Sequence, residues 1–379
     1  MDITNNINRE RLTETFIELI RINSPSYEEA KLGEVLIRKL SALGCETVTQ
    51  DYGKSFNVIA GLKGTMPKVQ PLLLCAHMDT IEPTEGMSFA LESDRIRCTG
   101  DTVLGADDKS ALAQIIEALT VIRECGIPHG DIEIVFTSAE EKGLNGSSNL
   151  DFSKLKSHYA LVPDSGGSVG SLVTAAPTHL TYEMRIAGRA AHAGIEPENG
   201  INAIRVAAGI IGLVPDGRID PLTTANIGII KGGTATNVVA KETVINGEIR
   251  GHDTNKIEEI RHKIFDTAGT VAGQYGADLN ISVVKEYSAY RIEEGDDFLR
   301  FLSGVYNKCG IEPVFKTTGG GSDANVLNSR GIKAINISNG MQRVHSSEEF
   351  ILLQDLYDGC RVVLTAAAEF PEFSGMARR

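Results

Sequence analysis

The sequence has no closely spaced pair of cysteines and no excess of basic residues. Its six cysteines form no C-x-x-C pair and no zinc-finger spacing, so neither a redox dithiol nor a zinc finger is expected. Lys and Arg number 37 against 50 Asp and Glu, a formal net charge of −13. Nucleic acids and anionic membranes attract positively charged surfaces, so we expect the protein to bind neither of them.

A long apolar run is also missing. The longest such stretch, residues 203–214, contains Arg205 and is too short to span a bilayer. The polar start MDITNNINRERLTET lacks the basic and then apolar layout of a signal peptide. Several cysteines lie in apolar runs, as small buried residues do in a reducing compartment. We therefore expect a soluble cytoplasmic protein.

The length of 379 residues predicts two or three domains. In the first half, apolar strands alternate with helices, which is typical of a sheet covered on both faces. Ser26 and Glu29 have the spacing of a capping box that opens a helix ending near Gly44. The main expected elements here are strands at 57–61, 71–77, 132–138 and 159–163, and a helix at 107–123.

The pattern changes between residues 178 and 284 to the order β-α-β-β-α-β, which is typical of a ferredoxin-like unit. Helix and strand signals then resume to the end of the chain, so an α/β domain is interrupted by a smaller inserted α+β domain. The expected elements are strands at 179–186, 226–230, 244–250, 278–284 and 334–337, and helices at 200–213, 255–273, 298–309 and 353–369.

Histidine and acidic residues gather at the ends of the apolar strands, where an open α/β sheet forms its ligand crevice. Each segment by itself has an ordinary explanation, such as a polar turn, a helix cap or a solvated loop. Together, two histidines and several carboxylates suit two zinc ions about 3.5–4 Å apart. The five segments are HMDT (77–80), GADDK (105–109), FTSAEEKG (136–143), LVPDSGG (161–167) and VHSSEEF (344–350).

These segments, in this order, resemble the M20 metallopeptidases, and GADDK and FTSAEE are most similar to the peptidase T (tripeptide aminopeptidase) branch. The resemblance implies an α/β fold, with a three-layer α/β/α zinc-peptidase catalytic domain and an inserted ferredoxin-like α+β domain that serves as lid and dimerisation domain. The catalytic domain would comprise residues 1–177 and 288–379, and the inserted domain residues 178–287. The resemblance also implies a homodimer through the inserted domain.

The resemblance also implies roles for individual residues. The two zinc ions, which Mn²⁺ or Co²⁺ could replace, would be bound by a histidine and a carboxylate each, with a third carboxylate bridging them. Asp79 would orient a histidine ligand, and Glu140 would be the general base that takes a proton from water. The implied metal ligands are His77 and Asp164 for one ion, Glu141 and His345 for the other, and Asp107 as the bridge.

Further residues resemble substrate-binding positions of the family. His192, in GRAAHAG, would stabilise the oxyanion in its own active site or in that of a partner subunit. Asn237 would contact substrate, and Arg250 would bind a substrate carboxylate through its two-pronged guanidinium, although a strand-end salt bridge explains Arg250 equally well. Gly320 and Ser322, in the glycine-rich loop TGGGSDAN (318–325), would line the substrate backbone.

The predicted function is that of a dinuclear zinc hydrolase that releases the N-terminal residue of short peptides. One rival is an N-acyl amino acid deacylase or carboxypeptidase on the same site, which would accept a blocked amine. A second rival is a metal-binding protein without activity. The presence of Asp79 and Glu140, which the resemblance does not make metal ligands, disfavours this second rival.

Overall fold

The computed structural model describes residues 2–66 and 68–376. Tertiary contacts divide them into two compact units. Unit 1 holds residues up to 174, residues 291–317 and the chain from 322 onward, and unit 2 holds residues 175–290 and 318–321. The contacts therefore divide the glycine-rich loop, with residues 318–321 in unit 2 and residues 322–325 in unit 1, whereas the predicted boundaries place the whole loop in the catalytic domain.

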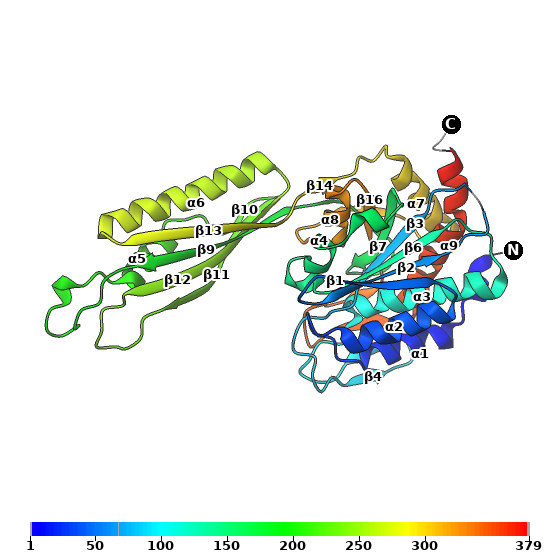
Figure 1. The fold of residues 1–379 in the computed structure, drawn as a ribbon, viewed down its shortest axis with the longest axis horizontal. Coiled ribbons are helices and arrows are strands. Elements are labelled where there is room, and N and C mark those ends of the chain that lie inside the picture. The colour runs from blue at the N-terminus through cyan, green and yellow to red at the C-terminus, as the bar shows by residue number, and fades with distance from the viewer. Residues whose placement is uncertain (1, 67, 377–379) are drawn as a thin grey trace. The chain divides into compact units, whose positions relative to one another are not determined.

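A mixed sheet forms the centre of unit 1 (Figure 1). The strands β3, β6, β7 and β16 run parallel to their neighbours, while β2 and β8 pair with this group antiparallel. All six residues of β3 are buried, as expected for a strand covered on both faces. In sheet order the strands are β1 (Glu46–Asp51), β2 (Phe56–Leu62), β6 (Ile132–Thr137), β3 (Leu72–His77), β7 (Tyr159–Ser165), β16 (Lys333–Ser338), β8 (Ser171–Ala176) and β14 (Tyr290–Arg291), with β15 (Val314–Thr317) also paired to β8.

Helices cover this sheet on both faces, which confirms the expected α/β/α layers. The helix α3 packs on β3 and β7, and α1 and α9 pack on α3, whereas α8 contacts β7 and β16. Figure 1 shows the strands between α3 and α8. The helices of unit 1 are α1 (Arg9–Ile20), α2 (Ala30–Ala42), α3 (Ala106–Cys125), α4 (Asn145–Ser148), α7 (Asp297–Lys308), α8 (Asp323–Ser329) and α9 (Leu353–Met376), with short 3₁₀ turns η1 (Ile3–Asn6), η2 (Glu140–Lys142) and η3 (Phe152–Lys154).

The expected capping box before α2 is wrong. Glu29 is the residue before the helix and makes no side-chain cap bond. Its carboxylate instead accepts hydrogen bonds from the N–H groups of Tyr27 and Ala139, and the Ser26 hydroxyl donates to Asp79. Both side chains make long-range contacts that local spacing does not reveal.

A second, small sheet completes unit 1. Its strands, in sheet order, are β17 (Met341–Gln342), β18 (Phe350–Leu352), β5 (Arg95–Cys98) and β4 (Phe89–Leu91).

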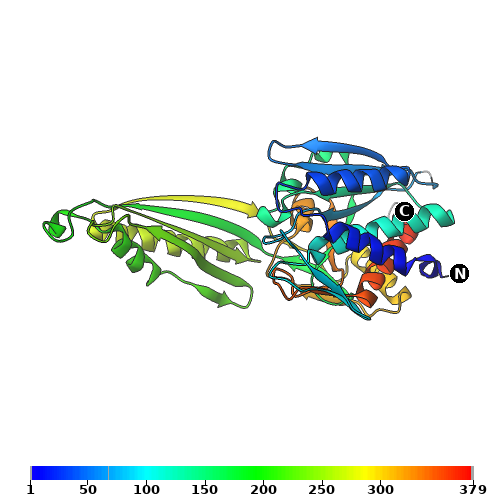
Figure 2. The same cartoon turned by 90° about the horizontal axis from the view of Figure 1, so that it is seen from below.

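Unit 2 has the predicted β-α-β-β-α-β order, with one additional short strand, β10. Its sheet order is β10-β11-β12-β9-β13, and the last four strands have the arrangement of a split βαβ unit. Figure 2 shows the two helices of this unit alongside its sheet. The elements are β9 (Thr178–Ala187), η4 (Pro197–Asn199), α5 (Ala203–Ile211), β10 (Gly217–Asp220), β11 (Thr223–Gly232), β12 (Glu242–Gly251), α6 (Thr254–Tyr275) and β13 (Asp278–Tyr287).

Periodic apolar residues explain why unit 2 has its own core. Met184 and Ile186 of β9, Ile245 of β12, Ile210 of α5 and Ile264 of α6 are each fully buried at 0% exposure in one hydrophobic cluster. These side chains lie on one face of the sheet and on the helix faces that cover it, as period-2 and period-3.6 patterns require. Among the described residues, no helix is both long and apolar enough to cross a membrane.

Candidate metal centre

Three parallel strands of unit 1 bring acidic and histidine side chains to one edge of the sheet. His77 is the last residue of β3, Asp164 is the next-to-last residue of β7, and Glu140 and Glu141 follow the end of β6. Because β6, β3 and β7 are parallel neighbours, their carboxyl ends meet at the same place. The structure thus brings together side chains whose sequence positions are up to 87 residues apart, counted from 77 to 164.

The imidazole of His77 is held in a defined orientation. Its Nδ1 atom lies 2.8 Å from the main-chain oxygen of Asp79, and the nearer carboxylate oxygen of Asp79 lies 3.5 Å away. A carbonyl oxygen only accepts hydrogen bonds, so we assign a proton to Nδ1, and Nε2 is the nitrogen that can bind a metal ion once it has lost its own proton. This Nε2 atom lies 3.0 Å from Asp107 Oδ1 and 3.6 Å from Asp164 Oδ1. One imidazole nitrogen therefore faces two carboxylates.

His345 makes a second arrangement of the same kind. It lies in the loop between β17 and β18, and its Nε2 atom is 2.8 Å from Glu141 Oε1 and 3.3 Å from Asp107 Oδ2. Asp107 therefore presents one carboxylate oxygen to each histidine. Its position at the start of α3 explains this, because the backbone at Asp107 and Asp108 departs from helical angles there. The carboxylate projects from an irregular turn and not from a regular helix.

These contacts are those of a metal-binding donor set. Ligand atoms lie within 4.8 Å of one another in three groups, two of which share Asp107. A neutral imidazole nitrogen flanked by carboxylate oxygens suits zinc and related divalent cations, and a carboxylate with one oxygen toward each group suits a bridging position. The residues present therefore fit a metal centre. The three groups are His77, Asp107 and Asp164; His77, Glu140 and Glu141; and Asp107, Glu141 and His345.

Asp79 shapes the turn that carries Glu140 and Glu141. Its carboxylate is fully buried and accepts hydrogen bonds from the N–H groups of Glu140 at 2.9 Å and Glu141 at 3.2 Å. The Ser26 hydroxyl donates to it at 2.7 Å. With its main-chain oxygen against His77, Asp79 links two strand ends. It orients His77 chiefly through the main chain, while its carboxylate positions the two glutamates.

The dense packing of acids and bases shifts their proton affinities. Burial raises the pKa of Asp164 to about 7 and raises the pKa of Glu140 well above its usual range, with the Asp164 carboxylate adding to the effect. Hydrogen bonds to Asp107 and Glu141 raise the pKa of His345 to about 10. Hydrogen bonds from His345 and His77 hold the pKa of Asp107 below its usual range, although burial acts in the opposite direction. Metal ions compete with protons for such ligands, so metal binding here releases protons.

Two buried carboxylates near this centre have contacts that the sequence analysis did not predict. Glu29 accepts hydrogen bonds from the N–H of Ala139 at 2.9 Å and the hydroxyl of Ser55 at 2.7 Å. Glu349 accepts hydrogen bonds from three main-chain N–H groups between residues 104 and 107. Each holds a loop that presents a predicted ligand. Glu349 lies inside the predicted ligand segment VHSSEEF, and Glu29 was predicted only as part of a capping box, so neither local pattern indicated these contacts.

The predicted substrate residues of unit 2 form two groups within that unit. The segments of His192 and Asn237 are adjacent, because the Ala193 N–H donates to the Asn237 carbonyl at 3.0 Å. Arg250 makes two hydrogen bonds to Glu248, each 3.1 Å long, and one to the Tyr287 hydroxyl at 3.3 Å. The guanidinium thus has the strand-end salt bridge that the sequence analysis weighed against substrate binding.

The glycine-rich loop is divided between the two units. Gly320 belongs to unit 2 and Ser322 to unit 1. The Ser322 side chain caps α8 in a capping box with Asn325, which accounts locally for the serine at this position. The Gly320 N–H donates to the Thr318 hydroxyl at 3.2 Å, so this part of the loop is a tight turn.

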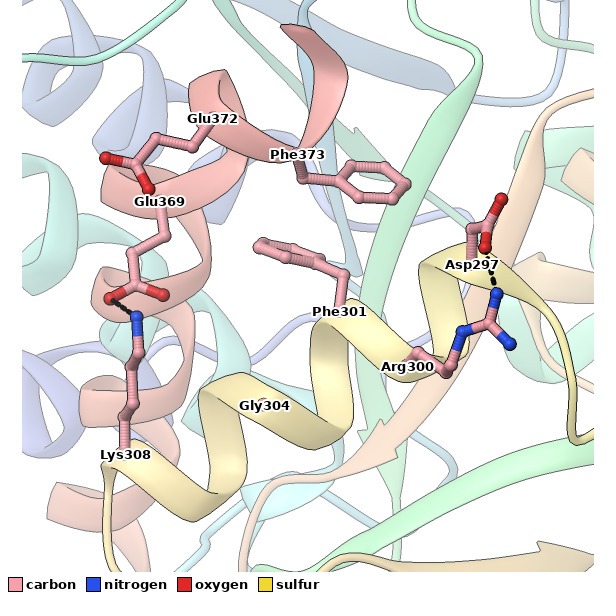
Figure 3. Close-up of a pocket in the computed structure, with 8 residues that line it drawn as sticks. All are labelled: Asp297, Arg300, Phe301, Gly304, Lys308, Glu369, Glu372 and Phe373. Atoms are coloured by element: carbon pink, nitrogen blue, oxygen red, sulfur yellow. Dashed lines mark hydrogen bonds and ion pairs between the residues drawn. The ribbon is translucent and has the colours of Figure 1, made fainter. Parts of the chain in front are cut away.

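A groove of about 460 Å³ between α7 and α9 contains none of the predicted ligands (Figure 3). The rings of Phe301 and Phe373 stack there with centroids 4.9 Å apart. The charged side chains beside them pair with each other, Lys308 with Glu369 at 2.7 Å and Arg300 with Asp297. These two ion pairs involve four of the five charged side chains that line the groove.

Comparison with known proteins matches both parts of the chain to peptidase families. Residues 174–276 match the M20 peptidase dimerisation domain, and residues 57–171 match peptidase family M28. The uncharacterized protein YqjE of Bacillus subtilis is 37% identical over 96% of this chain and 99% of its own length. Peptidase T of Escherichia fergusonii is 30% identical over 72% of this chain and 67% of its own length.

Solved structures give the same result over nearly the whole chain. Aminopeptidase PepT from Bacillus cereus has a TM-score of 0.86 and 36% identity, covering 96% of this chain and 99% of its own. A tripeptidase from Staphylococcus aureus has a TM-score of 0.91 and 32% identity, covering 97% and 99%. Human carnosine dipeptidase 1, at 14% identity and a TM-score of 0.74, shares the fold.

Proposed function

The chain belongs to the M20 peptidase family, in its peptidase T-like branch, and on this basis we propose that it is a metal-dependent aminopeptidase that releases the N-terminal residue of short peptides. The relatives named as an aminopeptidase and a tripeptidase match over almost their full length. Their activities support aminopeptidase action over the rival deacylase and carboxypeptidase activities. A metal-binding protein without activity is not favoured either.

The observation that carries the proposal is the pair of histidines that face the two oxygens of Asp107, with Glu140 beside them. Two divalent cations, when bound, would polarise the scissile carbonyl and lower the pKa of a water molecule. We assign His77 and Asp164 to one cation, Glu141 and His345 to the other, and Asp107 to both. This donor set accepts Zn²⁺, Mn²⁺ and Co²⁺, and we propose Zn²⁺ as the native ion.

Glu140 is the proposed general base. Its side chain is 8% exposed and belongs to the group formed with His77 and Glu141, and the hydrogen bond from its N–H to Asp79 fixes its backbone. A carboxylate held there can take a proton from the attacking water and deliver it to the departing amine. Burial raises its pKa, and the Asp164 carboxylate adds to the effect, which makes it a better proton acceptor than an ordinary glutamate.

The remaining substrate contacts are proposed from the family resemblance. We assign oxyanion stabilisation to His192, and substrate binding to Asn237, Arg250, Gly320 and Ser322. For Arg250, the two bonds to Glu248 mean that a substrate carboxylate would share or replace an existing partner of the guanidinium.

We also propose that the protein is a homodimer joined through unit 2, whose residues match a peptidase dimerisation domain. The sheet offers suitable surfaces, because β10 pairs with β11 only as far as Ala225 and leaves the rest of β11 at the edge. Ile229 and Ile230 on this part of β11 are each 50% exposed, and Val284 on the other edge strand, β13, is 55% exposed. Exposed apolar edge strands are usual sites of pairing with a second chain.

For the location we propose the cytoplasm. The six cysteines are unpaired, and five of them are buried, which suits a reducing compartment.

The experiment that tests the activity compares a tripeptide with its N-acetylated form, using the metal-loaded enzyme and mass spectrometry of the products. We expect the first residue to be released from the free tripeptide alone. Cleavage of only the acetylated peptide would instead establish a deacylase or carboxypeptidase.

A further inference from the structure

Glu349 is a buried carboxylate that the proposed chemistry does not use. Its side chain is 1% exposed and lies against the loop that leads into α3. One oxygen accepts hydrogen bonds from the N–H groups of Leu104 at 2.6 Å and Gly105 at 2.9 Å. The other oxygen accepts a hydrogen bond from the N–H of Asp107 at 3.0 Å. A single carboxylate thus holds three main-chain groups of one short loop.

The backbone of Glu349 is itself anchored on both sides. Its carbonyl accepts a hydrogen bond from the Cys98 N–H at 2.9 Å, and the next residue, Phe350, pairs with Arg97 in the small sheet. Four residues earlier in the same loop is His345, whose Nε2 atom faces Asp107 Oδ2 at 3.3 Å. The loop that supplies a histidine ligand therefore also supplies the carboxylate that holds the facing aspartate.

From these contacts we propose that Glu349 is a positioning residue for the metal centre, which sets the Asp107 carboxylate between the two histidines by fixing the main chain from Leu104 to Asp107. The inference rests on the proposed function only in that the centre binds metal. Asp107 faces both histidines, so a displacement of this loop alters both metal positions together. Glu349 need not touch substrate or metal for this effect.

The loop of residues 104–107 needs the hydrogen bonds to Glu349 to hold the Asp107 carboxylate in place. The first turn of α3 has non-helical backbone angles at Asp107 and Asp108, so regular helix geometry does not determine where the Asp107 carboxylate points. Hydrogen bonds from N–H groups to a charged acceptor are stronger than those between neutral groups. Replacing a residue that orients a metal ligand without binding the metal itself typically lowers metal affinity roughly 10–100-fold.

The test uses Glu349→Gln, with Glu348→Gln as the matched control. Glutamine keeps the size of the side chain but replaces one acceptor oxygen with an N–H₂ group, which must face a main-chain N–H as donor against donor. Glu348 is the adjacent residue in the same loop, but its side chain is 70% exposed and, among the residues that the structure describes, is paired with Arg343 alone. The control therefore removes the same charge without touching residues 104–107.

Metal affinity of the full-length protein is measured by competition between each variant and a zinc chelator, and Co²⁺ absorption spectra report the ligand geometry. We expect Glu349→Gln to bind Zn²⁺ roughly 10–100-fold more weakly and to alter the Co²⁺ spectrum, while Glu348→Gln matches the wild type in both. Circular dichroism of the metal-free variants checks that they fold. Wild-type affinity and spectrum in a folded Glu349→Gln protein would overturn the proposal.

A second measurement needs no variant, in case Glu349→Gln does not fold. Hydrogen–deuterium exchange of the metal-free wild-type protein should show slow exchange for the N–H groups of residues 104, 105 and 107. Rapid exchange there would mean that Glu349 does not hold the loop before metal binds, and the proposal would be wrong. Failure of the peptidase proposal would appear separately, as a wild-type protein that binds metal but cleaves no peptide.

Discussion

Glu140 and Glu141 are neighbours in sequence, yet the structure assigns them different surroundings. Glu141 lies 2.8 Å from the His345 imidazole, as a ligand beside another ligand does. Glu140 has its main-chain N–H on Asp79, and no imidazole contact within hydrogen-bond range is seen for its carboxylate among the described residues. The main chain therefore orients Glu140 while its carboxylate stays available for proton transfer.

This difference leads to a prediction for Glu140→Ala. We expect the variant to retain the metal content of the wild type, because ligand atoms remain on five other side chains. We expect kcat for tripeptide hydrolysis to fall by about 10²–10⁴-fold, the usual contribution of a positioned general base. Metal analysis by mass spectrometry and steady-state kinetics measure the two quantities. Wild-type turnover in a metal-loaded variant would remove Glu140 from the mechanism.

At the scale of single elements, the strands of unit 2 contain a close approach that requires glycine. Gly247 of β12 pairs with Tyr182 of β9, and a Cβ atom at position 247 would lie 2.3 Å from the Tyr182 hydroxyl oxygen and 2.6 Å from the main-chain oxygen of Asn226. Gly269 in α6 is the opposite case, because it is exposed and a Cβ atom there would meet nothing within 4 Å.

We therefore predict opposite effects of the same substitution at these two glycines. Gly247→Ala should lower the free energy of unfolding by about 1–3 kcal/mol, the usual cost of overpacking. Gly269→Ala should raise it by about 0.5–1 kcal/mol, because alanine loses less conformational freedom in a helix than glycine does. Urea denaturation followed by circular dichroism measures both changes. Equal stability of the two variants would contradict the assigned packing.

At the scale of the whole molecule, all members of the main hydrophobic cluster of unit 2 lie between residues 180 and 272. The predicted metal ligands, in contrast, all belong to unit 1. Unit 2 is also nearly continuous in sequence, since only residues 318–321 come from elsewhere. A continuous chain with its own core satisfies the usual requirements for independent folding.

We accordingly predict that a fragment of residues 175–290 folds by itself into an α+β protein that binds no zinc. Circular dichroism and a cooperative urea transition test the folding, and equilibrium dialysis tests zinc binding. Sedimentation equilibrium then tests the proposed homodimer, because the fragment should be dimeric if unit 2 carries the interface. A monomeric fragment beside a dimeric full-length protein would place the interface in unit 1.

The sequence by itself determined the alternation of helices and strands, the inserted β-α-β-β-α-β unit and the segments that carry the predicted ligands. These features are local: apolar periodicity and polar residues at strand ends depend on neighbours only a few positions away. Local reasoning failed at Ser26 and Glu29, where capping-box spacing was overridden by bonds to Asp79 and Ala139.

The tertiary structure decided which atoms meet. Only the packed sheet shows that Asp107 has one oxygen toward His77 and the other toward His345, and that the main-chain oxygen of Asp79 is closer to His77 than its carboxylate. Glu349 and Leu104 are 245 residues apart in sequence, so no local pattern could pair them. A buried charge acquires its partners only when distant segments pack together and exclude water, and that is why these roles are visible only in the folded chain.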